Sequence, residues 1–177
     1  MADSLIPDGF RNGRVLDIGC GNYPYFLSTV KFVDKYGVDQ HVNEGHKNIP
    51  DDISLQKFNI ENSKTIPFKD GYFDVVTMLA VCEHINPILL PDRIREVYRI
   101  LKPGGKCIIT TPGAWTFFIL NGMTNLRLIS RIEIEEHKCL YSRFQISKML
   151  DKCGFWQEKI KSGYFELFMN TWITAEK

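Results

Sequence analysis

The stretch RVLDIGCGNYPYF, residues 14–26, decides the fold of this chain. It begins as an apolar run, which predicts a short strand over residues 14–19. Two glycines and an asparagine then break the run, and Pro24 suits the first turn of a helix that we expect to extend through Phe32. A turn between a strand and a helix needs flexible residues whatever its function, so a role in ligand binding depends on the rest of the chain.

Further strands follow this turn along the chain. Short apolar runs rich in β-branched residues, with little alternation, are typical of strands buried on both faces of a sheet. They predict strands at residues 35–39, 55–60, 73–79 and 106–111. The last residues of the chain predict two more strands, joined as an antiparallel hairpin at Ser162 and Gly163.

Two longer helices separate or follow these strands. The first spans residues 91–105 and has apolar residues at helical spacing, with Pro103 and Gly104 as its expected end. The second begins at Ser142, which forms a capping box with Gln145, and ends before Gly154. The alternation predicts a single α/β domain over residues 1–177, with a doubly wound, mostly parallel, seven-stranded sheet and a C-terminal antiparallel hairpin.

The composition excludes several other classes of protein. Lys and Arg number 22 against 21 Asp and Glu, so no cationic field exists to attract a nucleic acid. No apolar run approaches the roughly 20 residues of a membrane-spanning helix, and no secretory signal is apparent. Five cysteines, an odd number without a C-x-x-C pair, argue against a disulfide framework and against a zinc site. We therefore expect a cytoplasmic protein without a bound metal.

The glycine turn lies where a doubly wound sheet binds ligands, which is at the carboxyl ends of its strands. Gly19 and Gly21 permit close approach of the backbone to a ligand, and the next helix offers free N–H groups to negative charge. A dinucleotide such as NAD requires a third glycine at the position of Pro24. This mismatch disfavours an NAD-dependent oxidoreductase.

Five segments resemble those of a known family when they are taken together and in order. They are VLDIGCGN, YGVDQ, FNIEN, FKDGYFDVVTMLAVCEHI and LKPGGKCIITTPG. The set resembles the class I S-adenosylmethionine-dependent methyltransferases, in particular those that act on small molecules. The resemblance is strong over residues 13–113 and continues more loosely through EHKCLYSRFQISKMLDKCGF. It implies transfer of a methyl group from S-adenosyl-L-methionine to a small-molecule, glycan-type or lipid-type acceptor.

The resemblance also implies roles for individual residues. Asp17 and the turn that contains Gly19, Cys20, Gly21 and Asn22 would lie under the methionine moiety of the cofactor. Asp39, followed by Gln40, would accept hydrogen bonds from the ribose hydroxyls. Asn59 stands where the family more often has aspartate, next to the adenine, and Ile60 would pack on the ring. Leu79 and Ala80 would present backbone carbonyls to the amino group of the cofactor. Tyr23 departs from the third glycine of the family's usual G-x-G-x-G pattern.

Methyl transfer needs no protein nucleophile, but a general base assists a hydroxyl acceptor, and histidine suits this role near neutral pH. His84 follows the fourth strand at the cofactor edge, and His137 lies in the segment expected to cover the site. Both are catalytic candidates. The pairing of Glu83 with His84 recurs in members of the family with different acceptors, which favours a structural role. His41 and His46 lie in a polar loop and are expected to be solvated.

Residues 113–141 contain Trp115 and Phe118 among many apolar residues. With only about 13 residues before the first strand, this segment is the expected source of a substrate lid or of a homodimer contact. Ordinary core packing by a helix explains the same pattern. A catalytically silent module that binds S-adenosylmethionine or a protein partner also stays open as an alternative to an enzyme.

Overall fold

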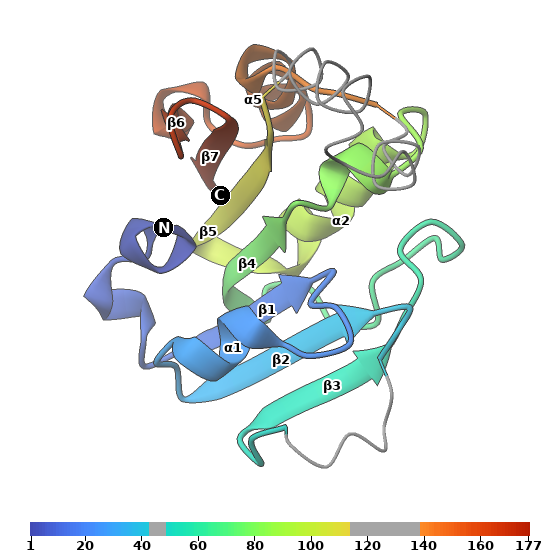
Figure 1. Cartoon of the computed structure of the whole chain (residues 1–177), viewed down its shortest axis with the longest axis vertical. Helices are drawn as coiled ribbons and strands as arrows, with labels where there is room; N and C mark the ends of the chain where they lie inside the picture. Colours follow the sequence, from blue (N-terminus) through green and yellow to red (C-terminus); the bar gives the residue numbers. More distant parts are fainter. Residues whose placement is uncertain (43–48, 114–138) are drawn as a thin grey trace, which may run out of the picture.

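The computed structural model describes residues 1–42, 49–113 and 139–177, and its centre is a seven-stranded sheet (Figure 1). The strand order is β3-β2-β1-β4-β5-β7-β6. Neighbouring strands are parallel from β3 to β5, whereas β7 is antiparallel to both β5 and β6. The strands are β1 (Arg14–Ile18), β2 (Asp34–Asp39), β3 (Ile53–Lys57), β4 (Phe73–Leu79), β5 (Leu101–Pro112), β6 (Lys161–Phe165) and β7 (Asn170–Glu176). This topology confirms the predicted fold class.

Helices cover both faces of the sheet, and each face has its own apolar core. On β1, Leu16 and Ile18 belong to the larger core, which is shared with helices α2 (Leu90–Ile100) and α5 (Arg143–Lys152). Val15, between them, belongs to the core that α1 (Tyr25–Thr29) covers. Successive side chains of a strand point to opposite faces, so apolar runs supply both cores at once. The short 3₁₀ helices are η1 (Ala2–Leu5), η2 (Asp8–Phe10), η3 (Cys82–His84) and η4 (Gln157–Lys159).

The helix predicted over residues 91–105 is shorter in the structure, where α2 ends at Ile100. Leu101 already pairs with Phe73 at the start of β5, before the Pro103-Gly104 dipeptide that was expected to end the helix. Lys177, the last residue, donates hydrogen bonds from Nζ to the carbonyls of Tyr98 and Leu101, at 2.7 and 2.8 Å. A cation at the final carbonyls stabilises a helix end. A residue far away in the sequence therefore caps the end of this helix.

Other element boundaries also differ from the prediction, including the ends of α1 and β3. Helix α1 ends at Thr29 rather than Phe32, because Val30 and Phe32 are buried from an extended backbone with exposed Lys31 between them. Strand β3 ends at Lys57 rather than residue 60. The chain then turns away, and residues 58–61 line the pocket described below.

The hairpin turn was predicted at Ser162 and Gly163, and this prediction is wrong. Both residues lie inside β6, where they pair with Ile173 and Trp172 of β7. A Cβ atom on Gly163 would lie 2.7 Å from the Trp172 ring, so the glycine provides room for an indole. The turn instead uses residues 166–169 at the end of β6.

The start and end of α5 agree with the prediction. Ser142 Oγ accepts a hydrogen bond from the Gln145 backbone N–H, and the Ser142 N–H donates to Gln145 Oε1. Gly154 follows the helix with a φ of +109°.

The five cysteines are free thiols. In the part of the chain that the structure describes, no helix is long and apolar enough to cross a bilayer.

Candidate cofactor pocket

A pocket of about 530 Å³ lies at the carboxyl ends of β1, β2 and β4. From β1 the sheet continues in one direction to β2 and in the other to β4, so the winding direction switches here. Such switch points are where open α/β sheets bind ligands, and the volume is typical of small-molecule sites. The lining residues are Ile18, Gly19, Val38, Asp39, Gln40, His41, Phe58, Asn59, Ile60, Glu61, Ala80, Val81, His84 and Ile85.

The glycine turn has a backbone conformation that favours glycine. Gly19 has a φ of +77° and Gly21 a φ of +73°. A Cβ atom on Gly19 would lie 2.3 Å from Cγ2 of Val81. For one on Gly21, the nearest atom among the described residues is the Tyr23 carbonyl oxygen, at 3.9 Å. Gly19 therefore lets the turn pack against Val81, two residues after β4, and Gly21 keeps the backbone open.

Asp39 joins the glycine turn to the end of β2. Its Oδ2 atom accepts a hydrogen bond of 3.0 Å from the Gly21 N–H, and Oδ1 accepts one of 2.7 Å from the His41 N–H. A carboxylate has about four lone-pair sites, so these two bonds orient the group and leave capacity for two further donors. The sequence placed Asp39 at a strand end, and only the structure shows that it fixes the turn.

Asp17 is buried below the turn and does not line the pocket. The pKa of its carboxyl is raised to about 7, mainly because the group is buried. The hydrogen bond of 2.6 Å from Thr77 Oγ1 lowers this pKa, whereas the negative charge of Asp39 raises it further. A nearby cation would favour the ionised form. The charge of this acid is therefore sensitive to what binds near the turn.

Polar side chains form a connected rim where β2 and β3 end. Asn59 donates a hydrogen bond of 2.8 Å from Nδ2 to Gln40 Oε1. The Nε2 atom of the same Gln40 amide lies 3.0 Å from His41 Nε2. Asn59 Oδ1 accepts from the backbone N–H groups of Glu61 and Asn62, at 2.9 and 3.1 Å. Most of the hydrogen-bonding capacity of Asn59 therefore shapes this loop.

His84 reaches the pocket from the short helix η3, directly after β4. The preceding Ala80 has a φ of +55°, which is uncommon for a residue with a side chain and recurs at functional sites. Glu83 connects η3 to the rest of the fold. Its Oε2 atom accepts a hydrogen bond of 3.1 Å from Thr111 Oγ1 on β5, and its backbone carbonyl accepts one of 3.2 Å from the Cys139 N–H. Burial raises the pKa of the Glu83 carboxyl.

The structure brings together some of the predicted site residues but not all of them. Gly19, Asp39, Gln40, Asn59, Ile60, Ala80 and His84 line the pocket. Cys20, Gly21, Asn22 and Leu79 flank it without lining it, and the Cys20 thiol is buried, which raises its pKa to about 12. His46, His137, Trp115 and Phe118 lie outside the described residues, as does most of the expected cover over residues 113–141.

Several lining residues were not predicted from the sequence. Phe58, Val81 and Ile85 supply apolar walls, and Glu61 accepts a hydrogen bond of 2.7 Å from the Asn86 N–H across the pocket. His41 is exposed, as expected, but it also lines the pocket. Each of these residues follows a strand end by a few positions. This position in the sequence is the feature from which they could have been predicted. Among the described residues, no group of three His, Cys, Asp or Glu is arranged to hold a metal ion.

A doubly wound sheet with a glycine turn and an acidic strand end at its switch point defines a domain that binds a nucleotide-type cofactor. Residues 3–158 match the family model of the methyltransferase domain. The chain belongs to this family, which confirms the resemblance seen in its sequence.

Individual relatives agree with this assignment. The chain is 26% identical over 168 residues to a ubiquinone biosynthesis O-methyltransferase of Psychrobacter arcticus, a match that covers 86% of this chain and 62% of the relative. It is 30% identical over 114 residues to a ubiquinone/menaquinone biosynthesis C-methyltransferase of Vibrio campbellii, covering 57% and 42% of the two chains. The chain thus spans less than two thirds of the length of these relatives.

Solved structures of methyltransferases have the same fold. A methyltransferase of Archaeoglobus fulgidus, described as SAM-dependent, superposes with a TM-score of 0.72 at 20% identity, over 95% of this chain and 88% of that one. A methyltransferase of Thermotoga maritima, described as SAM-dependent and as a possible histamine N-methyltransferase, gives 0.71 at 21% identity, over 99% and 85%.

Proposed function

We propose that this chain binds S-adenosyl-L-methionine in the pocket and transfers its methyl group to a small-molecule acceptor. The observation that carries the proposal is the joining of the glycine turn to Asp39 at the switch point of the sheet. Membership of the methyltransferase family supports the reaction. The names of the relatives, which are enzymes of ubiquinone and menaquinone biosynthesis, support a small molecule as the acceptor.

The residues of the pocket fit such a cofactor. Asp39 has lone pairs left for ribose hydroxyls, and Ile60 and Phe58 offer apolar surface to an adenine ring. Asn59 has one Nδ2 proton beyond its bond to Gln40, so it can still donate to the base while it shapes the loop. Asp17, buried beneath the turn of Gly19, Cys20, Gly21 and Asn22, would lie near the ammonium group without lining the pocket, and the backbone of Leu79 and Ala80 would bound the same end.

The bound cofactor would supply an electrophilic methyl group on a sulfonium. The chain's own contribution is to hold the acceptor in line with this methyl and to exclude water, which are positioning effects. For a hydroxyl or amine acceptor, we assign the uptake of the released proton to His84, which lines the pocket. Loss of turnover in His84→Ala, with cofactor affinity unchanged, would support this role. His137 stays a second candidate whose surroundings are outside the described residues.

Calorimetric titration of the purified chain tests the choice of cofactor. We expect saturable binding of S-adenosylmethionine and of its demethylated product S-adenosylhomocysteine, and none of NAD, because the turn lacks the third glycine at Pro24. Tight binding of NAD alone would overturn the proposal. A turnover screen with labelled S-adenosylmethionine then separates an enzyme from a silent binding module, since the silent module would bind without transferring the label.

Asp39→Ala should weaken binding of S-adenosylhomocysteine about ten- to a hundredfold, because a charged acceptor for two hydroxyl donors is lost. Asp34→Ala is the matched control, since Asp34 lies at the opposite end of β2 and pairs with Arg14 on the surface. Circular dichroism would check that both variants are folded. Equal affinity of the folded Asp39 variant and the parent would refute the ribose assignment.

We also propose a cytoplasmic location, because the five cysteines are all free thiols and Cys82 and Cys107 are buried. Fractionation of cells that express the full-length protein tests this location. Recovery in an oxidising compartment would contradict it.

A further inference from the structure

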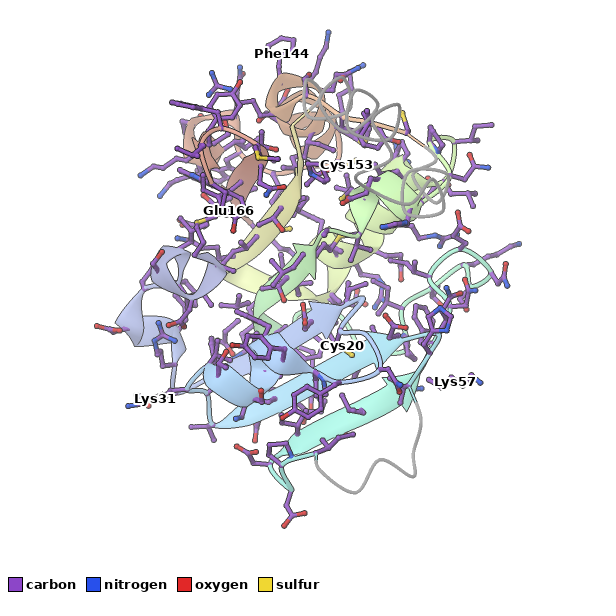
Figure 2. All side chains as sticks on the ribbon, in the orientation of Figure 1. Cys20, Lys31, Lys57, Phe144, Cys153 and Glu166 are labelled. Carbon is purple, nitrogen blue, oxygen red and sulfur yellow. The ribbon has the colours of Figure 1, made fainter. Side chains whose placement is uncertain are left out.

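Three polar side chains, those of Gln40, His41 and Asn59, form the rim of the pocket at the ends of β2 and β3. All three residues line the pocket. Figure 2 labels Lys57, the last residue of β3, which precedes the loop that carries Asn59. The direction in which hydrogen bonds are donated along the rim follows from the one amide whose orientation is fixed by the backbone.

The Asn59 amide can take only one of its two orientations. Its Oδ1 atom accepts hydrogen bonds of 2.9 and 3.1 Å from the backbone N–H groups of Glu61 and Asn62. An amide nitrogen in place of this oxygen would point its protons at two backbone donors. The nitrogen, Nδ2, therefore faces Gln40, and Asn59 contributes a donor to the rim.

The fixed orientation of Asn59 sets the polarity of the other two side chains. Asn59 Nδ2 donates to Gln40 Oε1 at 2.8 Å, so Nε2 is the Gln40 atom that faces His41, 3.0 Å from the Nε2 atom of the imidazole. An amide nitrogen donates and does not accept, so His41 Nε2 accepts and the neutral ring carries its proton on Nδ1. Donation therefore runs in one direction, from Asn59 through Gln40 to His41.

The two amides of the rim offer both kinds of hydrogen-bonding group to a ligand. Each amide nitrogen has two protons and uses one of them within the rim, which leaves one N–H on Asn59 Nδ2 and one on Gln40 Nε2. Gln40 Oε1 accepts one hydrogen bond within the rim and has a second lone pair. A carboxylate in place of the Asn59 amide would offer acceptors alone.

The rim lies where the far edge of a bound base is expected. Under the proposed function, Asp39 at the end of β2 binds the ribose, and Phe58 and Ile60 pack on the base. Strand β3 lies beside β2 at about 4.8 Å, and Lys57 at its end pairs with Asp39. A purine that leaves a ribose at Asp39 spans this strand spacing, so the edge that carries its C6 group reaches Asn59.

We propose that the pocket accepts a purine with either an amino or an oxo group at C6, so that it does not discriminate adenine from hypoxanthine in the cofactor. An amino group would donate to Gln40 Oε1, and an oxo group would accept from Asn59 Nδ2. The ring nitrogen N1, an acceptor in adenine and a donor in hypoxanthine, would take the other group of the rim in each case. Strong discrimination arises when one ligand leaves buried polar groups unpaired, and this rim can pair with both. The inference rests on the proposed function, because it takes Asp39 as the ribose acceptor.

Calorimetric titration of the full chain with S-adenosylhomocysteine and with S-inosylhomocysteine, its 6-oxo counterpart, tests the proposal. We expect the two dissociation constants to agree within about threefold. In Asn59→Asp the carboxylate should accept from the amine and repel the oxo group, so this variant should prefer S-adenosylhomocysteine about ten- to a hundredfold. Aspartate can accept the same two backbone hydrogen bonds, so the variant should fold. Asn62→Asp is the matched control, because it makes the same change at an exposed neighbour that does not line the pocket, and it should bind both ligands as the parent does.

Two results would overturn this inference alone. One is a preference of the parent for S-adenosylhomocysteine of tenfold or more. Loss of that preference in Glu61→Gln would then assign the recognition of the amine to Glu61, a carboxylate that also lines the pocket. The other is equal binding of the two ligands by the folded Asn59→Asp variant. Binding of neither ligand by the parent would overturn the proposed function and this inference with it.

The polarity of the rim can also be measured without a ligand, from the NMR shifts of the His41 ring nitrogens. In the neutral ring of the parent we expect the proton on Nδ1. In Asn59→Asp, Gln40 Nε2 should donate to the new carboxylate, which turns Gln40 Oε1 toward His41 and moves the ring proton to Nε2. Asn62→Asp should keep it on Nδ1. A proton on Nε2 in the parent would show that donation runs the other way, and the proposal would be wrong.

Discussion

Gly19→Ala is expected to lower the free energy of unfolding by about 2–4 kcal/mol and to impair binding of S-adenosylhomocysteine. Two costs add at this position. The φ of +77° is unfavourable for alanine, and the new Cβ would lie 2.3 Å from Cγ2 of Val81, which lines the pocket. Relief of this contact requires the glycine turn and the end of β4 to move apart. Urea denaturation followed by calorimetric titration of the folded variant measures both effects.

Gly71→Ala separates the two costs. Gly71 also has a positive φ, of +61°, but among the described residues no atom lies within 4 Å of its added Cβ. We therefore expect this variant to lose only the stability that an unfavourable backbone conformation removes, about 1–2 kcal/mol of unfolding free energy, with cofactor binding unchanged. If the two variants lose the same stability and both bind the cofactor normally, close packing at Gly19 is not what the site requires.

Asp17→Asn is expected to change the free energy of unfolding of the cofactor-free protein more favourably at pH 8 than at pH 4. The difference between the two pH values should be about 2–4 kcal/mol. The folded-state pKa of Asp17 is raised to about 7 from an ordinary value of 3.8, mainly by burial. Between these two values the folded chain holds a proton that the unfolded chain has released. Stability of the parent therefore falls as pH rises through this window, and it does not fall further above about pH 7.

Asparagine does not ionise, so the difference in unfolding free energy between variant and parent should grow from pH 4 to 7 and then level off. Taking the difference cancels the contributions of other titratable groups, including Glu83, whose carboxyl pKa burial also raises. In the parent, S-adenosylhomocysteine should bind more tightly as pH rises through 7, because its ammonium favours the ionised acid. A difference that does not change with pH would show that Asp17 keeps an ordinary pKa in the folded chain.

Local sequence was sufficient to predict the features that depend on near neighbours. The capping box of Ser142 and Gln145 forms as predicted, because both partners lie within one helical turn. The apolar runs predicted β1, β2, β4 and β5, since strands buried on both faces leave a continuous pattern. The order of the five motif segments was enough to indicate the family.

Predictions failed where a distant residue decides the local structure. Gly163 was taken for a turn residue, but the Trp172 ring across the hairpin is what requires a glycine there. The end of α2 is capped by Lys177, whose ammonium binds the carbonyls of Tyr98 and Leu101 from the other end of the chain. No spacing rule within the helix indicates such a partner.

The sequence by itself therefore determined the fold class, the family and the ends of β2 and β4, two of the strands from which the site is built. Only the tertiary structure decided that Asp39 holds the glycine turn, that Asn59 and Gln40 form one rim and that Asp17 is buried with a raised pKa. The physical reason is that hydrogen bonds and desolvation act between atoms close in space. The sheet order brings β1, β2 and β4 together at one edge, although their residues lie far apart along the chain.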